Sequence, residues 1–356
     1  MYSFIKCKKI NLIITFLLIV ILLVSIIFTI SIGSADVPVE TVYKVLSDMI
    51  FNGGQGIKNG LYSTPHYHII WDIRLPRVLL GVICGAGLAI CGAVMQAIVL
   101  NPIADPYILG VSSGASAGAA FALLMPLPNI IGGNHVTFTA MIGAMIASIL
   151  VYTMAKLGGG GKLQPVTLLL SGTAVNAVMS AITSLLIFMA KSHESIASIY
   201  NWQMGSIASA QWRNLLIPTI GVLFGIVLFS ACGNKFNLMM MGDDDAQALG
   251  INVKLFRTVI MATISIVVST IVSVTGIIGF VGLIIPHIVR LIFKTSNNKI
   301  IIPQSAILGS IFLIYADAGA RSLFGAAELP IGIITAFIGA PFFLYLMAKK
   351  SYGGKE

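Results

Sequence analysis

Two short motifs in the sequence contain residue types that occur in catalytic sites. Gly110–Gly114 fits the G-x-S-x-G pattern of a serine nucleophile, but that pattern requires a strand, a turn and a helix in an α/β sheet. Gly158–Gly161 precede Lys162 as in a phosphate-binding loop, but such a loop needs Ser or Thr after the lysine, and Leu163 follows here. Both motifs stand in apolar surroundings, where small residues commonly let membrane helices approach one another.

Metal and redox chemistry also lack a recognisable pattern. The five histidines include no His-Glu-x-x-His pair, and the four cysteines lie in or beside apolar runs without zinc-site spacing. His66 and His68 are two residues apart and are only a weak indication of a metal. We therefore predict that the chain is not an enzyme, binds no cofactor or metal, and has no ATP site of its own.

The composition indicates the solvent in which the chain folds. Of its 356 residues, 57% are hydrophobic and 9% are charged, whereas a soluble domain has about 25% charged residues. The mean hydropathy of +0.99 agrees. The formal net charge of +9 comes from lysines and arginines at the ends of apolar runs rather than from a basic patch, so no nucleic-acid partner is expected. The sequence predicts an integral membrane protein in contact with the lipid bilayer.

Ten apolar runs have about the 20 residues that a membrane-spanning helix needs. The seventh and eighth are the least distinct, because almost no loop separates them. The first run is too long for a signal peptide, whose apolar part has about 7–15 residues, so we expect an uncleaved helix. The runs are 10–32, 77–99, 107–126, 136–156, 165–190, 214–232, 257–275, 277–293, 301–317 and 330–348.

The distribution of positive charges predicts the orientation. Lys6, Lys8 and Lys9 precede the first run, which places the N-terminus in the cytoplasm. Alternation then places Lys254, Arg257 and most other positive charges inside, and an even number of crossings places the C-terminus inside as well. We expect one transmembrane domain, 1–356, in the cell membrane.

The longest outer segment, 33–75, contains a helical pattern. Asp36 and Pro38 precede apolar residues at a spacing of three to four, which predicts a short amphipathic helix on the outer surface. Its expected apolar face is Val42, Val45, Leu46, Met49 and Ile50.

Acidic residues are almost confined to loops and the ends of runs. Ion-driven carriers usually place charged side chains along their pathway, so their scarcity disfavours an ion-coupled pump. If the chain moves cargo uphill, the energy is expected to come from another subunit.

Three polar stretches stand out from the apolar background. The first is Asp72–Arg77 at the outer end of the second run, which continues to Asn101–Pro106 at its inner end. The second is Gly242–Gly250, in the inner loop after the sixth run. The third extends from Gly279–His287 through 327–332 to Pro341.

Together these stretches resemble the FecCD-type permeases of ABC importers, which carry ferric siderophores, haem and cobalamin. The resemblance covers about residues 70–348. It implies an all-α polytopic fold of the type II importer class, with about ten transmembrane helices, and a dimer that is usually formed by two identical copies. It also implies two cytoplasmic ATPase subunits, which bind ATP and Mg²⁺, and an external substrate-binding protein.

Three outer arginines, Arg74, Arg77 and Arg321, run against the positive-inside bias. Guanidinium groups bind carboxylates in pairs of hydrogen bonds, and the resemblance implies that arginines at these positions dock the binding protein. We therefore expect these three arginines to form a basic rim at the outer end, where carboxylates of the binding protein would bind. The alternative is lipid anchoring or an internal pair, such as Arg321 with Asp317 four residues earlier.

The inner loop 233–256 is implied to couple the chain to the ATPase. Gly242, Asp243, Ala246, Leu249 and Gly250 carry this interpretation, with Gly250 ending one short helix and residues 251–256 beginning a second. Ala246, Leu249 and Met241 are expected to share an apolar face. Acids in the first turn also suit an ordinary solvated helix, which is the alternative.

The resemblance also implies gate and pathway residues. Asn101 and Ile103 flank Pro102, which ends the second run, and relatives place a cytoplasmic gate there. A plain helix end is the alternative. Relatives place a second gate before the fifth run, where this chain departs from them with Pro165 and Val166.

The fifth run is expected to line the pathway through Thr173 and Asn176, although polar helix contacts explain such residues as well. The sequence thus predicts the membrane subunit of an ATP-driven importer for a siderophore, haem or cobalamin chelate. The alternative is an ion-coupled secondary carrier for a small polar substrate.

Overall fold

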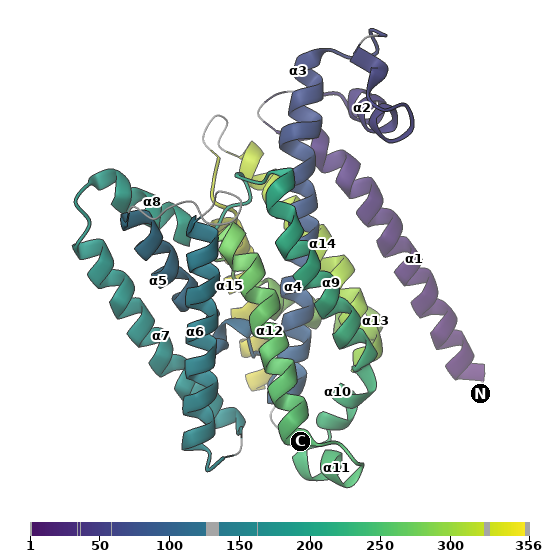
Figure 1. The fold of residues 1–356 in the computed structure, drawn as a ribbon. Coiled ribbons are helices and arrows are strands. Elements are labelled where there is room, and N and C mark those ends of the chain that lie inside the picture. Colours follow the sequence, from purple (N-terminus) through teal and green to yellow (C-terminus); the bar gives the residue numbers. More distant parts are fainter. Residues whose placement is uncertain are drawn as a thin grey trace.

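The chain is helical throughout its described length. The computed structural model describes residues 2–33, 35, 37–57, 59–125, 135–161, 163–323 and 328–352. Within these ranges the helices are joined by turns and short extended segments, and no strand occurs. The first helix begins and the last helix ends toward the same end of the bundle (Figure 1), as the predicted even number of crossings requires. We call this the inner end.

Ten helices of the described chain match the ten predicted crossings. Within the described residues, seven helical segments are long and apolar enough to cross a membrane, and the apolar segments of α5, α13 and α15 (Ile331–Tyr345 in α15) are shorter. The crossing helices are α1 (Tyr2–Ser31), α4 (Leu75–Val99), α5 (Val111–Leu124), α6 (His135–Gly158), α7 (Pro165–Phe188), α9 (Leu216–Ala231), α12 (Val253–Thr275), α13 (Val281–Phe293), α14 (Asn298–Ser322) and α15 (Ile331–Tyr352).

Shorter helices lie at the two ends of the bundle. The outer end carries α2 (Val39–Phe51), η1 (Gln55–Ile57), α3 (Thr64–Tyr67), the π-helix η2 (His68–Arg74), α8 (His193–Gln203) and η4 (Trp212–Leu215). The inner half carries η3 (Pro106–Leu109), α10 (Gly233–Met239) and α11 (Asp243–Ala248).

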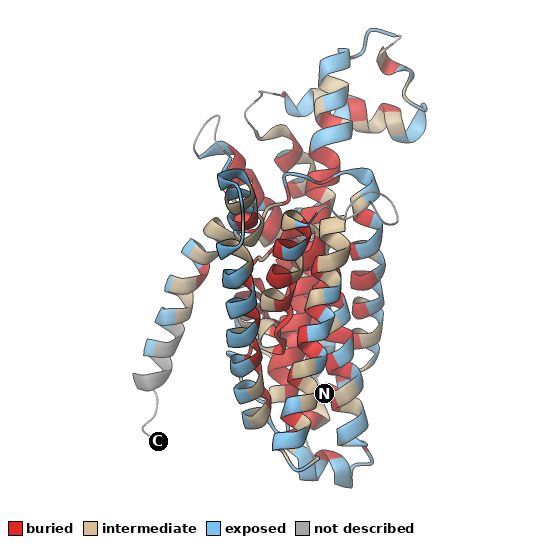
Figure 2. Ribbon diagram, turned by 60° about the vertical axis from the view of Figure 1, so that its left-hand side comes forward, coloured by how far each residue is buried: buried red, intermediate tan, exposed pale blue. Residues whose placement is uncertain are grey.

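The central helix of the bundle is α4. Nearly all of its residues are buried, and it packs on α14, α13, α9 and α12; Figure 2 shows the buried residues gathered along the middle of the bundle. Close approach depends on glycine, because a Cβ atom added to Gly92 would lie 2.0 Å from the carbonyl oxygen of Gly282 on α13. Gly114 packs in the same way on Gly143 of α6. The G-x-S-x-G pattern is therefore a helix contact, as predicted.

The eighth crossing is a broken one. After α12 ends at Thr275, residues 276–280 are not helical, with positive φ angles at Gly276 and Phe280, and α13 starts at Val281. Within a membrane, irregular backbone is tolerated only where other protein groups satisfy it. The hydroxyl of Tyr107 does this: it donates to the carbonyl of Ile278 at 3.0 Å and accepts from the Ile278 amide at 3.3 Å.

A proline inside α13 releases a second carbonyl. Pro286 has no N–H, so the carbonyl of Gly282, four residues earlier, loses its helical partner. Nε2 of Gln96 on α4 donates to this carbonyl at 3.2 Å, and Oε1 of Gln96 accepts from Nη1 of Arg290 at 2.6 Å. A buried side chain of α4 thus compensates for the proline.

The outer segment is more helical than predicted. Helical backbone runs without interruption from Thr64 to Val99, so the loop predicted over 33–75 ends near residue 63, and the helix extends beyond the bundle (Figure 1). On α2, Val42 and Val45 are fully buried as expected, but Ile50 is 69% exposed. The reason is that α2 packs against α1 and η2, which cover only part of its apolar face. Asp36 lies outside the described residues.

A buried carboxylate holds this outer segment together. Oδ2 of Asp48 accepts from the hydroxyl of Tyr62 at 2.6 Å and from the amide of Gly56 at 2.8 Å. These bonds favour the ionised carboxylate and lower the pKa of Asp48, with the Tyr62 bond the largest cause. Burial and the same carboxylate raise the pKa of Tyr62 to about 12. Asp48 therefore ties α2 to the segment that precedes α3.

We expect Asp48→Asn to increase hydrogen exchange of the Gly56 amide, because the neutral amide oxygen is a weaker acceptor than the carboxylate. The wild type should lose the same protection on acidification. Folding lowers the pKa of Asp48, so its ionised carboxylate stabilises the outer segment at pH values above the ordinary pKa of 3.8. This stabilisation is lost as the pH falls through the lowered pKa. Glu40→Gln, which removes an exposed carboxylate from the same helix, is the control; equal exchange in both variants would contradict the prediction.

Candidate functional site

The predicted coupling loop lies at the inner end of the bundle. Its short helix α11 is at the tip of that end (Figure 1). Gly250 ends α11 as predicted. It has a φ of +88°, which glycine adopts without strain. Its amide donates to the carbonyl of Gln247 at 3.0 Å, and the amide of Ile251 donates to Ala246 at 3.0 Å. This pair of bonds satisfies the last carbonyls of the helix.

The expected second short helix is the beginning of α12. Oδ1 of Asn252 accepts from the amide of Leu255 at 3.0 Å, so Asn252 caps a helix that continues from Val253 to Thr275. Any force on the loop therefore acts directly on a transmembrane helix.

The apolar residues of the loop do not share one face. Ala246 is fully buried, next to Met239 and Ile251, because α11 packs on α10 and the start of α12. Leu249 is 57% exposed and Met241 is 60% exposed. This corrects the expected single face: Ala246 fixes the loop to the chain, and Leu249 and Met241 are free to contact a partner.

Asp243 of this loop binds a buried arginine of α12. The side chain of Arg257 is 5% exposed, and its two terminal nitrogens lie 2.7 and 2.9 Å from the two carboxylate oxygens of Asp243. Nothing in the sequence distinguishes Arg257 from the other inner positive charges, because its burial depends on helices that are distant in the chain.

The predicted gate lies where α4 ends at Val99. The side chain of Asn101 closes a local turn, with its Oδ1 accepting from the amide of Ile103 at 3.1 Å. In this arrangement Asn101 forms part of the turn that follows α4, as the alternative of a helix end expects. Ile103 is 44% exposed and remains available to a gate. The second gate segment precedes α7, with Gln164 exposed and Val166 65% exposed.

The two expected pathway residues of α7 have different surroundings. Thr173 is exposed, and its hydroxyl bonds only to the carbonyl of Leu170 in its own helix at 2.8 Å. Asn176 is half-buried and accepts from the hydroxyl of Ser113 on α5 at 2.6 Å. Thr173 is therefore exposed on the surface of α7, whereas Asn176 makes the polar helix contact given as the alternative.

Several large apolar side chains on α7 and α15 are exposed in the described part of the chain. Figure 2 shows the C-terminal helix extending away from the bundle toward the inner end. Phe188 is 86% exposed and Phe337 is 77% exposed. Exposed Ser180 and Ser184 continue the polar positions on α7 beyond Thr173. Lipid alone does not suit such a mixture of exposed hydroxyls and aromatic rings.

The three outer arginines are buried, with 4–5% exposure each. Arg74 and Arg321 bind the carbonyls at the end of α1. Arg74 donates to Ile30 and Ser31 at 2.8 Å and to Ala35 at 2.6 Å, and Arg321 donates to Ile32 at 2.6 Å and Thr29 at 3.0 Å. Thr29, Ile30 and Ser31 are in the last turn of α1, whose carbonyls a helix end leaves unpaired and whose dipole favours positive charge.

Arg77 completes an ionic cluster between α4, α14 and the segment before α15. Its Nε lies 2.9 Å from Oδ1 of Asp317, whose Oδ2 lies 3.0 Å from Nε of Arg321. Its Nη1 lies 2.8 Å from Oε2 of Glu328. The exposed rim predicted for Arg74, Arg77 and Arg321 is therefore wrong in this structure, and the internal pair of Arg321 with Asp317 is confirmed.

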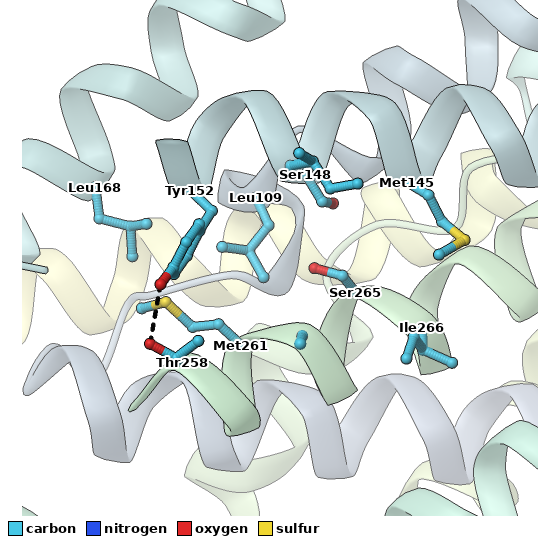
Figure 3. Close-up of a pocket in the computed structure, with 11 residues that line it drawn as sticks. Leu109, Met145, Ser148, Tyr152, Leu168, Thr258, Met261, Ser265 and Ile266 are labelled. Carbon is cyan, nitrogen blue, oxygen red and sulfur yellow. Dashed lines mark hydrogen bonds between the residues drawn. The ribbon is translucent and has the colours of Figure 1, made fainter. Parts of the chain in front are cut away.

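An apolar cavity of about 310 Å³ lies between α6, α7 and α12 (Figure 3). The hydroxyls of Tyr152 and Thr258 bond across it at 3.2 Å. Its lining residues carry no charge, and Ile149 and Ile266 on its walls are 58% and 41% exposed on the outside of the bundle. It offers no partner for a charged cargo, so we do not place the pathway there.

The chain belongs to the FecCD transport family, whose model matches residues 21–349. It is 42% identical over 279 residues to the cobalamin import permease BtuC of Halobacterium salinarum, covering 78% of this chain and 73% of that one. It is 35% identical over 286 residues to the hemin transport permease HmuU of Yersinia pestis, covering 80% and 84%. A solved ABC transporter described as of the metal-chelate type, in an inward-facing conformation, superposes with a TM-score of 0.80 and 29% identity, covering 96% of this chain and 99% of that one.

These similarities confirm the family resemblance and the all-α, multi-span membrane fold. The chain is therefore a permease of the ABC transporter class, and its relatives serve chelates, haem and vitamin B12.

Asp317→Ala should destabilise the permease strongly, because buried Arg321 would keep only backbone carbonyls as acceptors and Arg77 would keep only Glu328 as a carboxylate partner; breaking a buried pair costs about 3–5 kcal/mol. Thermal unfolding of the detergent-solubilised chain measures the effect. Asp72→Ala is the matched control, since its carboxylate binds His68 with both side chains about half exposed and should matter little. Equal melting temperatures for the two variants would show that the arginines do not depend on Asp317.

Proposed function

We propose that the chain is the membrane subunit of an ATP-driven importer that carries a ferric siderophore, haem or a cobalamin across the cell membrane. Membership of the FecCD family over residues 21–349 carries this proposal. The absence of a catalytic constellation among the motifs of the sequence agrees with a subunit that gates a pathway and leaves ATP hydrolysis, with its Mg²⁺, to a partner.

The partner at the membrane is a second copy of this chain. The unpartnered face of α7 and α15 combines exposed aromatic rings with hydroxyl groups such as that of Thr173. A second copy would bury the rings and leave the hydroxyls to line a wide passage between the copies. Such a passage suits large cargo that must be released as well as bound.

Two ATPase subunits would bind the inner end. Leu249 and Met241 are exposed apolar side chains on a loop that the buried Ala246 fixes to the rest of the chain. These two side chains are suited to insert into an apolar groove on the ATPase. A substrate-binding protein would dock at the outer end. There the buried arginines would hold the shape of the docking surface rather than form its contacts.

The proposal is tested by reconstituting the chain in liposomes with an ABC ATPase and a substrate-binding protein from the same organism. Cyanocobalamin, haemin and a ferric hydroxamate siderophore are the probes. We expect accumulation of one of them that requires ATP on the ATPase side and stops with vanadate. Accumulation by the chain alone, driven by a proton or sodium gradient, would instead establish the alternative of a secondary carrier.

Leu249→Asp should uncouple the assembled importer, because a charge would be placed in an apolar contact. We expect transport per ATP hydrolysed to fall about tenfold or more, the effect of losing one interface hot spot, with the fold intact because the residue is exposed. Leu249→Met keeps the contact apolar and is the control. Wild-type coupling in Leu249→Asp would remove this residue from the ATPase interface.

A further inference from the structure

Arg257 joins three parts of the inner end that are far apart in the sequence. Beside its paired bonds to Asp243, it donates from Nη1 to the carbonyl of Leu163 at 2.8 Å and from Nη2 to the carbonyl of Ile98 at 3.3 Å. Its guanidinium group, a rigid fork of donors, therefore contacts α11, the last turn of α4 and the segment that precedes α7.

The two carbonyl acceptors lie next to the two predicted inner gate segments. Ile98 would bond to the amide of residue 102 if α4 continued, but Pro102 has no N–H, and Arg257 supplies the missing donor. Leu163 is buried and lies two residues before the start of α7. Arg257 thus holds the backbone just before Asn101 and Ile103 and just before Gln164 and Val166.

The bond to α11 differs from the other two, because it ends on a group that a partner can move. The side chain of Asp243 is 47% exposed, whereas that of Arg257 is 5% exposed. A cleft of about 900 Å³ lies beside the pair, between α11 and the segment before α7. Among the described residues, Nε of Arg257 is buried without an acceptor, so this part of the chain leaves one donor of the guanidinium unsatisfied.

We propose that the pair Asp243–Arg257 transmits the movement of α11 to both inner gate segments, which rests on the proposed function above. A shift of α11 either carries Arg257 with it or leaves a buried positive charge without its carboxylate, and the second outcome is strongly unfavourable. Movement of the guanidinium in turn changes the bonds to Ile98 and Leu163. Arg257 is a positioning residue: it touches neither cargo nor nucleotide.

The test uses the complete importer in lipid nanodiscs, with the native cysteines replaced and Ile103→Cys spin-labelled in both permease copies. The distance between the labels is measured without nucleotide and with ATP and Mg²⁺, together with ATP hydrolysis. Asp243→Asn and Arg257→Lys are the test variants. Asp244→Asn removes the same charge from the neighbouring position, and Asp243→Glu restores the carboxylate.

We expect the wild type, Asp244→Asn and Asp243→Glu to change the label distance on binding ATP. In Asp243→Asn and Arg257→Lys the population of the ATP-dependent distance should fall at least about fivefold, the lower end of ordinary coupling between sites, while hydrolysis continues. A merely structural role would lower assembly and hydrolysis together with the distance change, and would overturn the proposal. So would a wild-type response in both test variants. If the wild-type distance never responds to ATP, the proposed function itself fails.

Discussion

The structure depends on satisfying backbone carbonyls where transmembrane helices end or break. Lipid supplies no hydrogen-bond donor, so each released carbonyl needs a side chain of the protein. Arg74 and Arg321 serve the end of α1, Tyr107 serves the break before α13, and Gln96 serves the carbonyl that Pro286 releases. The polar residues of this apolar chain are therefore concentrated at the places where its helices are irregular.

The two ends of the molecule differ in the partners that their buried arginines bind. At the outer end, a buried cluster of Arg77, Arg321 and Asp317 joins α4 and α14, and Arg321 also ties α14 to the end of α1. At the inner end, one buried arginine bonds to an exposed loop and to two helix ends. The outer cluster resists movement, whereas the inner one ends on a group that a partner can displace.

Much of the fold follows from local patterns. The ten apolar runs correspond to ten helices, because each run must satisfy its backbone internally whatever its neighbours are. Gly250 ends α11 where expected, because its left-handed backbone conformation favours glycine. The extension of the second crossing back to Thr64 was missed, because its polar residues resemble a loop in the sequence and fold as a helix only beside α2 and the end of α1.

The sequence by itself therefore determined the membrane environment, the number of the crossings and the family. These depend on composition, on the length of apolar runs and on short motifs. Only the tertiary structure decided which charges are exposed. Arg74, Arg77, Arg257 and Arg321 look alike in the sequence, yet each is buried against acceptors that lie tens to hundreds of residues away or on another helix. The physical reason is that the cost of burying a charge is set by the partners that meet it after folding, and adjacent residues do not encode those partners.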